Sequence, residues 1–217
     1  GGPCAYNPEP LADFIDLFII GEGEEINVKL FNLYNDLKVQ GKSKEEFLME
    51  ASKLQGIYVP RFYEPIYNDS GQITEIKKQY DFLPDRVKKV RVSNLNSTFK
   101  LDKLIVPYLE TIHQRSVVEL FRGCTQGCRF CEAGYIYRPI RERNVENVIE
   151  MVNNQLNSTG YNEVSLSSLS SCDYSNLNTL VDCLIDENTN KNLRVSLPSL
   201  RVDSISVDVL KKIEEVR

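Results

Sequence analysis

Apolar positions follow two different spacings along the chain, and the change comes near residue 116. Beyond it, short apolar runs alternate with stripes in which apolar residues recur every three or four positions, as on one face of a helix. The runs are 117–121, 164–167 and 193–197, and the stripes begin at 145, 177 and 207. Such alternation is typical of strands joined by helices, so this part is predicted to be an α/β fold with a parallel sheet.

The first part of the chain has a less regular pattern. An apolar run at 17–20, bounded by glycine, predicts a buried strand. Two amphipathic helices are expected, around 28–37 and 47–54. Ser43 is placed to cap the second helix, with Glu46 three residues later completing a capping box.

The middle of the chain predicts short extended elements. Residues 62–76 are expected to form a hairpin that turns at 68–71, where Asn, Asp, Ser and Gly follow one another. The run 87–92 predicts a further strand. His113 lies on a stretch with helix-like spacing, and we interpret it as a packed or hydrogen-bonded rather than a catalytic residue.

Composition narrows the class of protein. The chain has 217 residues, of which 41% are apolar, so a sizeable core is expected. Its 26 Lys and Arg residues against 31 Asp and Glu residues give a formal charge of −5, which gives no overall attraction for nucleic acid or for a membrane. No apolar run approaches the roughly 18 residues of a spanning helix, and no signal peptide opens the sequence. We expect a cytoplasmic protein without a membrane partner, with its six cysteines reduced.

Three of these cysteines lie in one short run. Cys124, Cys128 and Cys131 are spaced C-x3-C-x2-C, with Gly123 and Gly127 beside them. Three thiolates so close in sequence have to wrap a loop around a shared centre, and iron with sulfide is the usual one. Three ligands are one fewer than a closed site takes, which leaves a position where a substrate can bind.

Other interpretations of the cysteines remain open. A zinc site would need a fourth ligand, for which His113, Cys172 and Cys183 are the candidates. The cysteines could also be plain structural thiols. The metal content of anaerobically purified protein would separate an iron–sulfur centre from a zinc module.

At Cys124, Cys128, Phe130 and Cys131 the chain resembles the radical S-adenosylmethionine (radical SAM) superfamily. The resemblance implies that the three cysteines hold a [4Fe-4S] cluster whose open iron is chelated by S-adenosylmethionine. It implies reductive cleavage of that cofactor to methionine and a 5′-deoxyadenosyl radical, with flavodoxin or ferredoxin as a suitable reductant. The implied fold is a (βα)6 partial TIM barrel, of which 116–217 would be the first half.

The same resemblance suggests further cofactor-binding residues. Family members usually offer a Gly-Gly-Glu run to the methionyl amine, and the corresponding stretch here, 168–173, departs from it. The carbonyl groups of Ser170 and Ser171 and the carboxylate of Asp173 are the candidate acceptors. The alternative for Asp173 is a helix cap.

Three residues at the third run are candidates for the methionyl carboxylate. Ser196 lies in the strand expected at 193–197, Ser199 and Arg201 follow it, and Arg binds carboxylates well. A solvated Arg is the alternative. Phe130, directly before the last cysteine of the triad, is assigned to cofactor binding by the resemblance. Arg138, Arg141 and Arg143 could serve a substrate phosphate or RNA, although a solvated, salt-bridged face is the usual meaning of such a run.

A second resemblance concerns the start of the chain. Gly1-Gly2-Pro3 and residues 16–24 resemble the end of a Rossmann-like, cobalamin-binding domain, although the Asp-x-His-x-x-Gly motif that ligates cobalt does not occur. Cobalamin is therefore an expectation for the intact protein only. The expected domains are 1–42, the remnant of that domain; 43–115, a helix and hairpin connector; and 116–217, the first half of the radical SAM core.

The expected function is an iron–sulfur enzyme that cleaves S-adenosylmethionine to begin radical chemistry on an unknown substrate, RNA included. Methylthiolation of tRNA or protein is the alternative enzyme class, and it would need a second cysteine triad. Both ends of the chain look cut, so we expect a fragment of a longer protein. The third strand would then be an unpaired edge, and we expect this fragment alone to be inactive.

Overall fold

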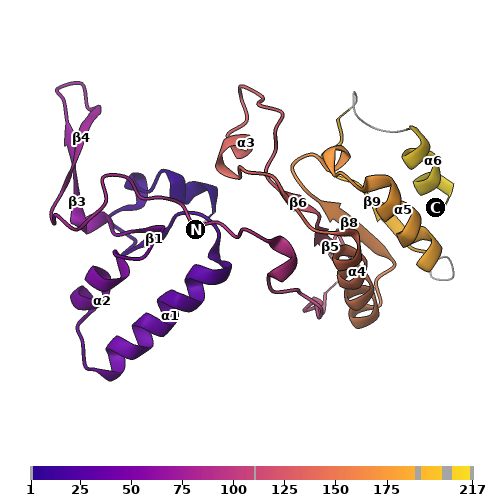
Figure 1. Ribbon diagram of the computed structural model, residues 1–217, viewed down its shortest axis with the longest axis horizontal. Coiled ribbons are helices and arrows are strands. Elements are labelled where there is room, and N and C mark those ends of the chain that lie inside the picture. The colour runs from indigo at the N-terminus through magenta and orange to yellow at the C-terminus, as the bar shows by residue number, and fades with distance from the viewer. Residues whose placement is uncertain (1, 110, 189–191, 202–206, 216–217) are drawn as a thin grey trace. The chain divides into compact units, whose positions relative to one another are not determined.

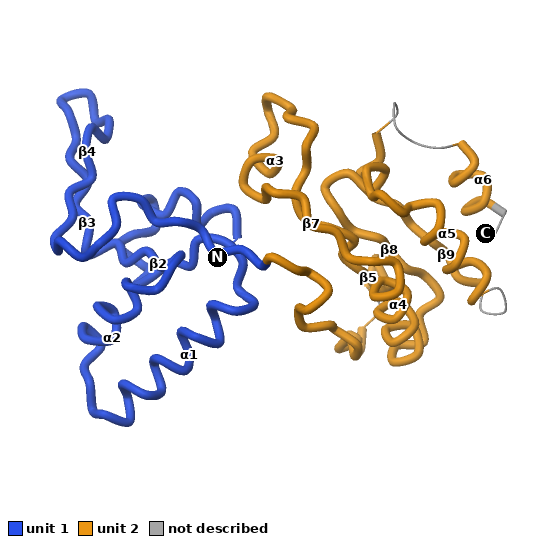
Figure 2. The backbone as a smooth tube through the Cα atoms, in the orientation of Figure 1, with its two compact units in different colours: residues 1–92 blue, residues 93–217 orange. Residues whose placement is uncertain are grey.

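The computed structural model describes residues 2–109, 111–188, 192–201 and 207–215 (Figure 1). The chain divides into two compact units, residues 1–92 and 93–217 (Figure 2). Each unit has its own apolar core, and we describe each by itself.

The N-terminal unit is built from short elements joined by turns. Its helices and strands are β1 (Phe18–Ile19), α1 (Gly23–Val39), α2 (Lys44–Ala51), β2 (Ile57–Tyr58), β3 (Tyr63–Tyr67) and β4 (Ile73–Lys78), with 3-10 turns at Pro3–Tyr6, Glu9–Leu11 and Pro60–Phe62. Strands β1 and β2 pair antiparallel, as do β3 and β4. The predicted hairpin is therefore confirmed.

The predicted cap of α2 is also confirmed. The Oγ atom of Ser43 accepts a hydrogen bond from the backbone N–H of Glu46 at 3.2 Å, and the Glu46 carboxylate accepts one from the N–H of Ser43 at 2.8 Å. These two bonds satisfy backbone donors that a helix end leaves without partners. They fix where α2 begins.

The strand predicted at 87–92 is wrong. Only Val90 pairs, in a single parallel bridge to Gly21, with its N–H donating to Ile20 O at 2.9 Å and its carbonyl accepting from Glu22 N at 3.1 Å. The N–H of Ile20 is already bound to Gly56 O at 2.7 Å, and after Glu22 the chain enters α1. No extended partner therefore remains for the rest of 87–92.

The helix-like stretch around His113 is also not a helix. Residues 99–109 and 111–115 contain no helix or strand. Pro107 interrupts the stretch, and its ring and missing N–H disfavour a helix interior. Apolar residues of this stretch are not packed in either core, since Ile105 and Ile112 are almost fully exposed.

The C-terminal unit follows the predicted alternation. Its elements are β5 (Ser116–Glu119), β6 (Phe121–Arg122), α3 (Ala133–Ile136), β7 (Arg141–Glu142), α4 (Val145–Thr159), β8 (Glu163–Ser167), α5 (Leu177–Glu187), β9 (Arg194–Ser196) and α6 (Val207–Glu215), with 3-10 turns η4 at Leu95–Ser97 and η5 at Ser171–Asp173. Strands β5, β8 and β9 form a parallel sheet in that order. The α/β class and the parallel sheet are confirmed, and closure into a partial barrel stays a prediction.

Helices α4 and α5 supply the apolar faces that cover this sheet (Figure 1). Asn144 caps α4 as predicted, accepting from the N–H of Asn147 at 3.3 Å, and Gly160 ends the helix in the left-handed conformation. The fully buried residues of the core include Val118, Leu120, Val148, Val152, Val164, Leu166, Leu180, Val181 and Leu184. Among the described helices, none is both long and apolar enough to cross a membrane.

Candidate metal centre

The triad of cysteines lies on a loop that leaves the sheet after β5. The loop, residues 123–140, is closed at its base by the antiparallel pair of β6 and β7, in which Phe121 faces Glu142 and Arg122 faces Arg141. Because β5, β8 and β9 are parallel, this loop shares one edge of the sheet with the segments that follow β8 and β9.

Gly123 allows the two sides of the loop to approach each other. Its φ is +94°, and a Cβ atom there would lie 2.8 Å from Pro139 O and 2.9 Å from Ile140 N. Only glycine fits this close backbone approach without strain. The glycine before the first cysteine therefore has a structural reason of its own.

The three cysteines carry unpaired thiols. Cys128 is exposed, whereas Cys124 and Cys131 are partly buried. The N–H of Gln126 donates to the Cys124 Sγ atom at 3.5 Å, and the N–H of Cys131 donates to Cys128 O at 3.0 Å. Gly127 turns the chain between them with a φ of +64°. The three cysteines thus lie on one turning loop, and a shared centre between them stays a prediction.

The segment after β8 is tied to the segment after β9 by one hydroxyl group. Ser171 is fully buried, and its Oγ atom lies 2.7 Å from Pro198 O, 3.2 Å from Leu166 O and 3.0 Å from Ser168 Oγ. Ser170 is also buried, and its Oγ atom has no hydrogen-bond partner among the described residues. A buried hydroxyl without a partner marks a place where a polar group can bind.

Asp173 joins the cysteine loop to the same edge. Its Oδ2 atom accepts a hydrogen bond from Gln126 Nε2 at 2.7 Å and lies 3.6 Å from Arg201 Nη1. The alternative role as a cap is not seen, because α5 begins at Leu177 after Asn176 and has no side-chain cap. The sequence suggested Asp173 and Arg201 as candidates but did not point to Gln126, whose position between two cysteines of the triad was the available signal.

Two of the predicted cofactor residues stand apart from these contacts. Phe130 is 93% exposed. Ser199 is exposed, has a φ of +59°, and makes no hydrogen bond to a described residue. A left-handed conformation is costly for a serine, and such strain is typical of functional turns. Neither residue makes a hydrogen bond or ion pair with Asp173 or Arg201.

The interpretation of Arg143 as part of a solvated face is wrong. Its side chain is 4% exposed, and its guanidinium group donates to Leu95 O and, at 3.1 Å, to Thr98 Oγ1. The Glu119 carboxylate lies 3.8 Å away. Arg143 therefore fastens η4 to the sheet, because five fixed donors suit a cluster of backbone and hydroxyl acceptors.

The other two arginines of that run brace the loop. Arg141 donates to Pro139 O at 3.1 Å and to Tyr137 O at 3.3 Å. The guanidinium group of Arg138 lies 4.8 Å from the centre of the Tyr135 ring, a cation–π distance. The basic run thus stabilises the loop that carries the triad.

The described side chains of the site do not converge on one point. Within the described part of the chain, no three His, Cys, Asp or Glu side chains converge where one metal ion would sit, the zinc candidates His113, Cys172 and Cys183 included. A [4Fe-4S] cluster makes a different demand, because each cysteine binds a different iron atom and the sulfur atoms stay apart.

Comparison with known families now gives this arrangement a context. The N-terminal family of radical SAM proteins matches residues 1–60, and the radical SAM superfamily matches residues 118–217. The chain carries radical SAM domains. An uncharacterized protein of Methanocaldococcus jannaschii is 26% identical over 215 residues, which cover 97% of this chain and 39% of that protein. The chain thus spans about two fifths of the length of this relative.

The residues of the radical SAM core domain fit a cluster. The domain contributes three unpaired thiols from one loop, and none of them is enclosed by the apolar core. The donor set matches the thiolate ligands of iron–sulfur centres, and the N–H of Gln126 is directed at one sulfur atom, as hydrogen bonds to cluster ligands usually are.

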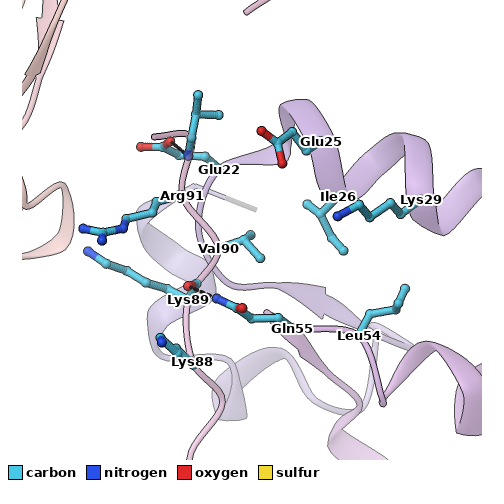
Figure 3. Close-up of a pocket in the computed structure, with 11 residues that line it drawn as sticks. Glu22, Glu25, Ile26, Lys29, Leu54, Gln55, Lys88, Lys89, Val90 and Arg91 are labelled. Carbon is cyan, nitrogen blue, oxygen red and sulfur yellow. Dashed lines mark hydrogen bonds between the residues drawn. The ribbon is translucent and has the colours of Figure 1, made fainter. Parts of the chain in front are cut away.

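The N-terminal radical SAM domain contains the Gly21–Glu24 turn, beside a cavity of about 640 Å³ (Figure 3). Gly21 has a φ of +115°, and a Cβ atom there would lie 2.0 Å from Val90 O. The glycine therefore accommodates the chain's own backbone rather than a cofactor. The described residues give no observation that fits cobalamin, and we derive no step through it.

Charges around this cavity do not converge. Figure 3 shows Val90 facing Ile26 and Lys29 across the hollow, whereas Lys89 and Arg91 extend on the other side of their segment. The Glu22 carboxylate accepts a hydrogen bond from the N–H of Val92 at 2.6 Å. The cavity lies beside the β-bridge between Gly21 and Val90, and both acidic and basic side chains line it.

Proposed function

We propose that this chain is the cluster-bearing part of a radical SAM enzyme. The carrying observation is that Cys124, Cys128 and Cys131 lie with unpaired thiols on one loop at the carboxyl edge of a parallel sheet, inside the matched domain. We assign the three thiolates to a [4Fe-4S] cluster. When bound, the cluster supplies the electron for reductive cleavage of S-adenosylmethionine.

The chain's own residues would orient the cofactor. Asp173 presents a carboxylate beside the loop, and the buried Ser170 hydroxyl lacks a described partner, so both are assigned to the methionyl amine together with the Ser170 and Ser171 carbonyl groups. Arg201, whose guanidinium group already lies near Asp173, is assigned to the methionyl carboxylate. Ser199 and Phe130 are assigned to the same cofactor on the resemblance alone.

The partners follow from the reaction class. A one-electron reduction needs a low-potential carrier, and we propose flavodoxin or ferredoxin in the cytoplasm. The substrate class is open, with RNA among the candidates. Family membership indicates how the reaction begins and leaves the substrate undefined.

The test is the metal content of the full-length protein after anaerobic reconstitution. We expect about four iron and four sulfide per chain, and a brown colour from charge transfer between thiolate and iron. Replacing Cys124, Cys128 and Cys131 together by Ala should remove both. Cys4→Ala, which changes an exposed thiol in the other unit, is the control and should keep them. Equal iron and sulfide in the triple variant would overturn the proposal.

A further inference from the structure

Gln126 contacts both parts of the candidate site. Its backbone N–H donates to the Cys124 Sγ atom at 3.5 Å, and its side-chain Nε2 donates to Asp173 Oδ2 at 2.7 Å. Gln126 is 47 residues from Asp173 in sequence, so the second contact joins the cysteine loop to the segment that follows β8. One residue therefore links a proposed cluster ligand to a proposed cofactor ligand.

The contact fixes one oxygen atom of the carboxylate and leaves the other open. Both Gln126 and Arg201 approach Oδ2, and Oδ1 accepts no hydrogen bond from a described residue. The Asp173 side chain is 21% exposed, so Oδ1 is reachable from solvent. A hydrogen bond to a charged acceptor is about twice as strong as one between neutral groups, which makes the amide an effective orienting group.

We propose that Gln126 is a positioning residue that aims the Asp173 carboxylate at the ammonium group of S-adenosylmethionine and couples the order of the cysteine loop to cofactor binding. The inference rests on the proposed function, which assigns Asp173 to that ammonium group. In this role Gln126 acts through Cys124 and Asp173. Because Gln126 contacts both Cys124 and Asp173, an ordered cysteine loop keeps the Asp173 carboxylate in position. In the same way, binding of the cofactor to Asp173 keeps the loop ordered.

A reversed pair separates the two roles. Gln126→Glu places a second carboxylate against Asp173, so the contact is lost and the two groups repel. Adding Asp173→Asn restores a bond of the same length with donor and acceptor exchanged, because Asn Nδ2 can donate to the new carboxylate. The loop is then fastened again, but no carboxylate stands at 173.

Two measurements on the full-length protein follow the two roles. The rate at which a chelator removes iron from the reconstituted protein reports how well the loop is fastened. The change that S-adenosylmethionine produces in the electron paramagnetic resonance spectrum of the reduced cluster, titrated with cofactor, reports cofactor affinity. Thr125→Ala is the matched control, since Thr125 lies in the same loop and makes no described contact to Asp173.

For Gln126→Glu we expect iron release about tenfold faster and cofactor affinity about tenfold weaker, as for the loss of one charge-assisted hydrogen bond. The reversed pair should return iron release to within about twofold of wild type while affinity stays weak. Unchanged values for Gln126→Glu, or a reversed pair that restores neither or both, would overturn the inference alone. A wild-type protein that takes up no iron and sulfide would instead overturn the proposed function, and this inference with it.

Discussion

The two units use glycine in the same way and with different results. Gly21 in the N-terminal unit and Gly123 in the C-terminal unit both have left-handed φ values, and at both a Cβ atom would collide with the backbone of a distant segment. After Gly123 the chain presents three thiols on a loop. After Gly21 it begins α1, and the close approach is filled by Val90. A glycine in a tight turn therefore marks a backbone crossing, and the chemistry depends on the side chains that follow.

The largest loss of stability should come from adding a side chain at Gly21, where the backbone of the N-terminal unit crosses Val90. For Gly21→Ala we expect a loss of about 4 kcal/mol or more in the free energy of unfolding of that unit, because the new Cβ atom meets Val90 O at 2.0 Å and the φ of +115° is strained for alanine. Denaturant unfolding followed by near-ultraviolet circular dichroism measures it. Gly71→Ala, with a φ of +75° and open space around it, is the control and should cost about 1 kcal/mol. Equal losses would show that the crossing is not the cause.

Replacing the glycine of the C-terminal crossing, Gly123, by alanine should destabilise the protein slightly less than Gly21→Ala and should also lower its iron content. For Gly123→Ala we expect a loss of about 3 kcal/mol and a lower iron content after reconstitution, because Pro139 and Ile140 must move apart at the base of the loop. Gly134→Ala, in α3 with no atom near its added Cβ, is the matched control and should keep its iron. If Gly123→Ala bound iron as wild type does, the closed base would be unimportant for the site.

The arginine run offers a sharper comparison within one unit. Arg143→Met should cost about 2 kcal/mol, because Leu95 O and Thr98 Oγ1 lose their donors in a buried place. Arg138→Met, at an exposed position over Tyr135, should change stability by less than about 0.5 kcal/mol. Thermal unfolding of both variants measures the difference. A larger loss for Arg138→Met than for Arg143→Met would contradict the structural role given to Arg143.

The smallest effect concerns a hydroxyl beside Arg143. Tyr174 donates to Arg143 O at 2.8 Å, and burial together with Glu142 and Glu146 raises the pKa of Tyr174 to about 12. Since the pKa is raised on folding, this contribution is present below pH 10 and is lost as the pH rises toward 12. Tyr174→Phe should lose about 1 kcal/mol at neutral pH and should show a weaker fall in stability between pH 10 and 12. An unchanged alkaline profile would contradict the role given to this tyrosine.

Much of the C-terminal unit was predictable because its signals are local. The apolar stripe of α4, its cap at Asn144 and the run of β8 each depend on neighbours within a few residues, and the structure confirms them. The spacing of the cysteine triad is equally local. Physical periodicity suffices where a helix or strand buries one face on a regular sheet.

The failures share a different cause. The run at 87–92 looks like a strand, but its pairing was decided by Gly21 and Gly56, far away in sequence. The burial of Arg143 depends on acceptors at Leu95 and Thr98, and the contact of Gln126 with Asp173 depends on how a loop folds onto a strand end. Such contacts carry no periodic signal, so the sequence alone could not supply them.

The short ladder between β6 and β7 bears on how the protein receives its metal. It ties Phe121–Arg122 to Arg141–Glu142 through backbone groups, and no cysteine takes part. The entropic cost of closing the loop is therefore offset by folding of the chain and does not have to be offset by metal binding. In contrast to small zinc domains, which fold only around their ion, the apoprotein is expected to be folded with its three cysteines already on one closed loop. Assembly of the centre is then a step that follows folding, and Cys128 is the thiol of the three that is most open to solvent.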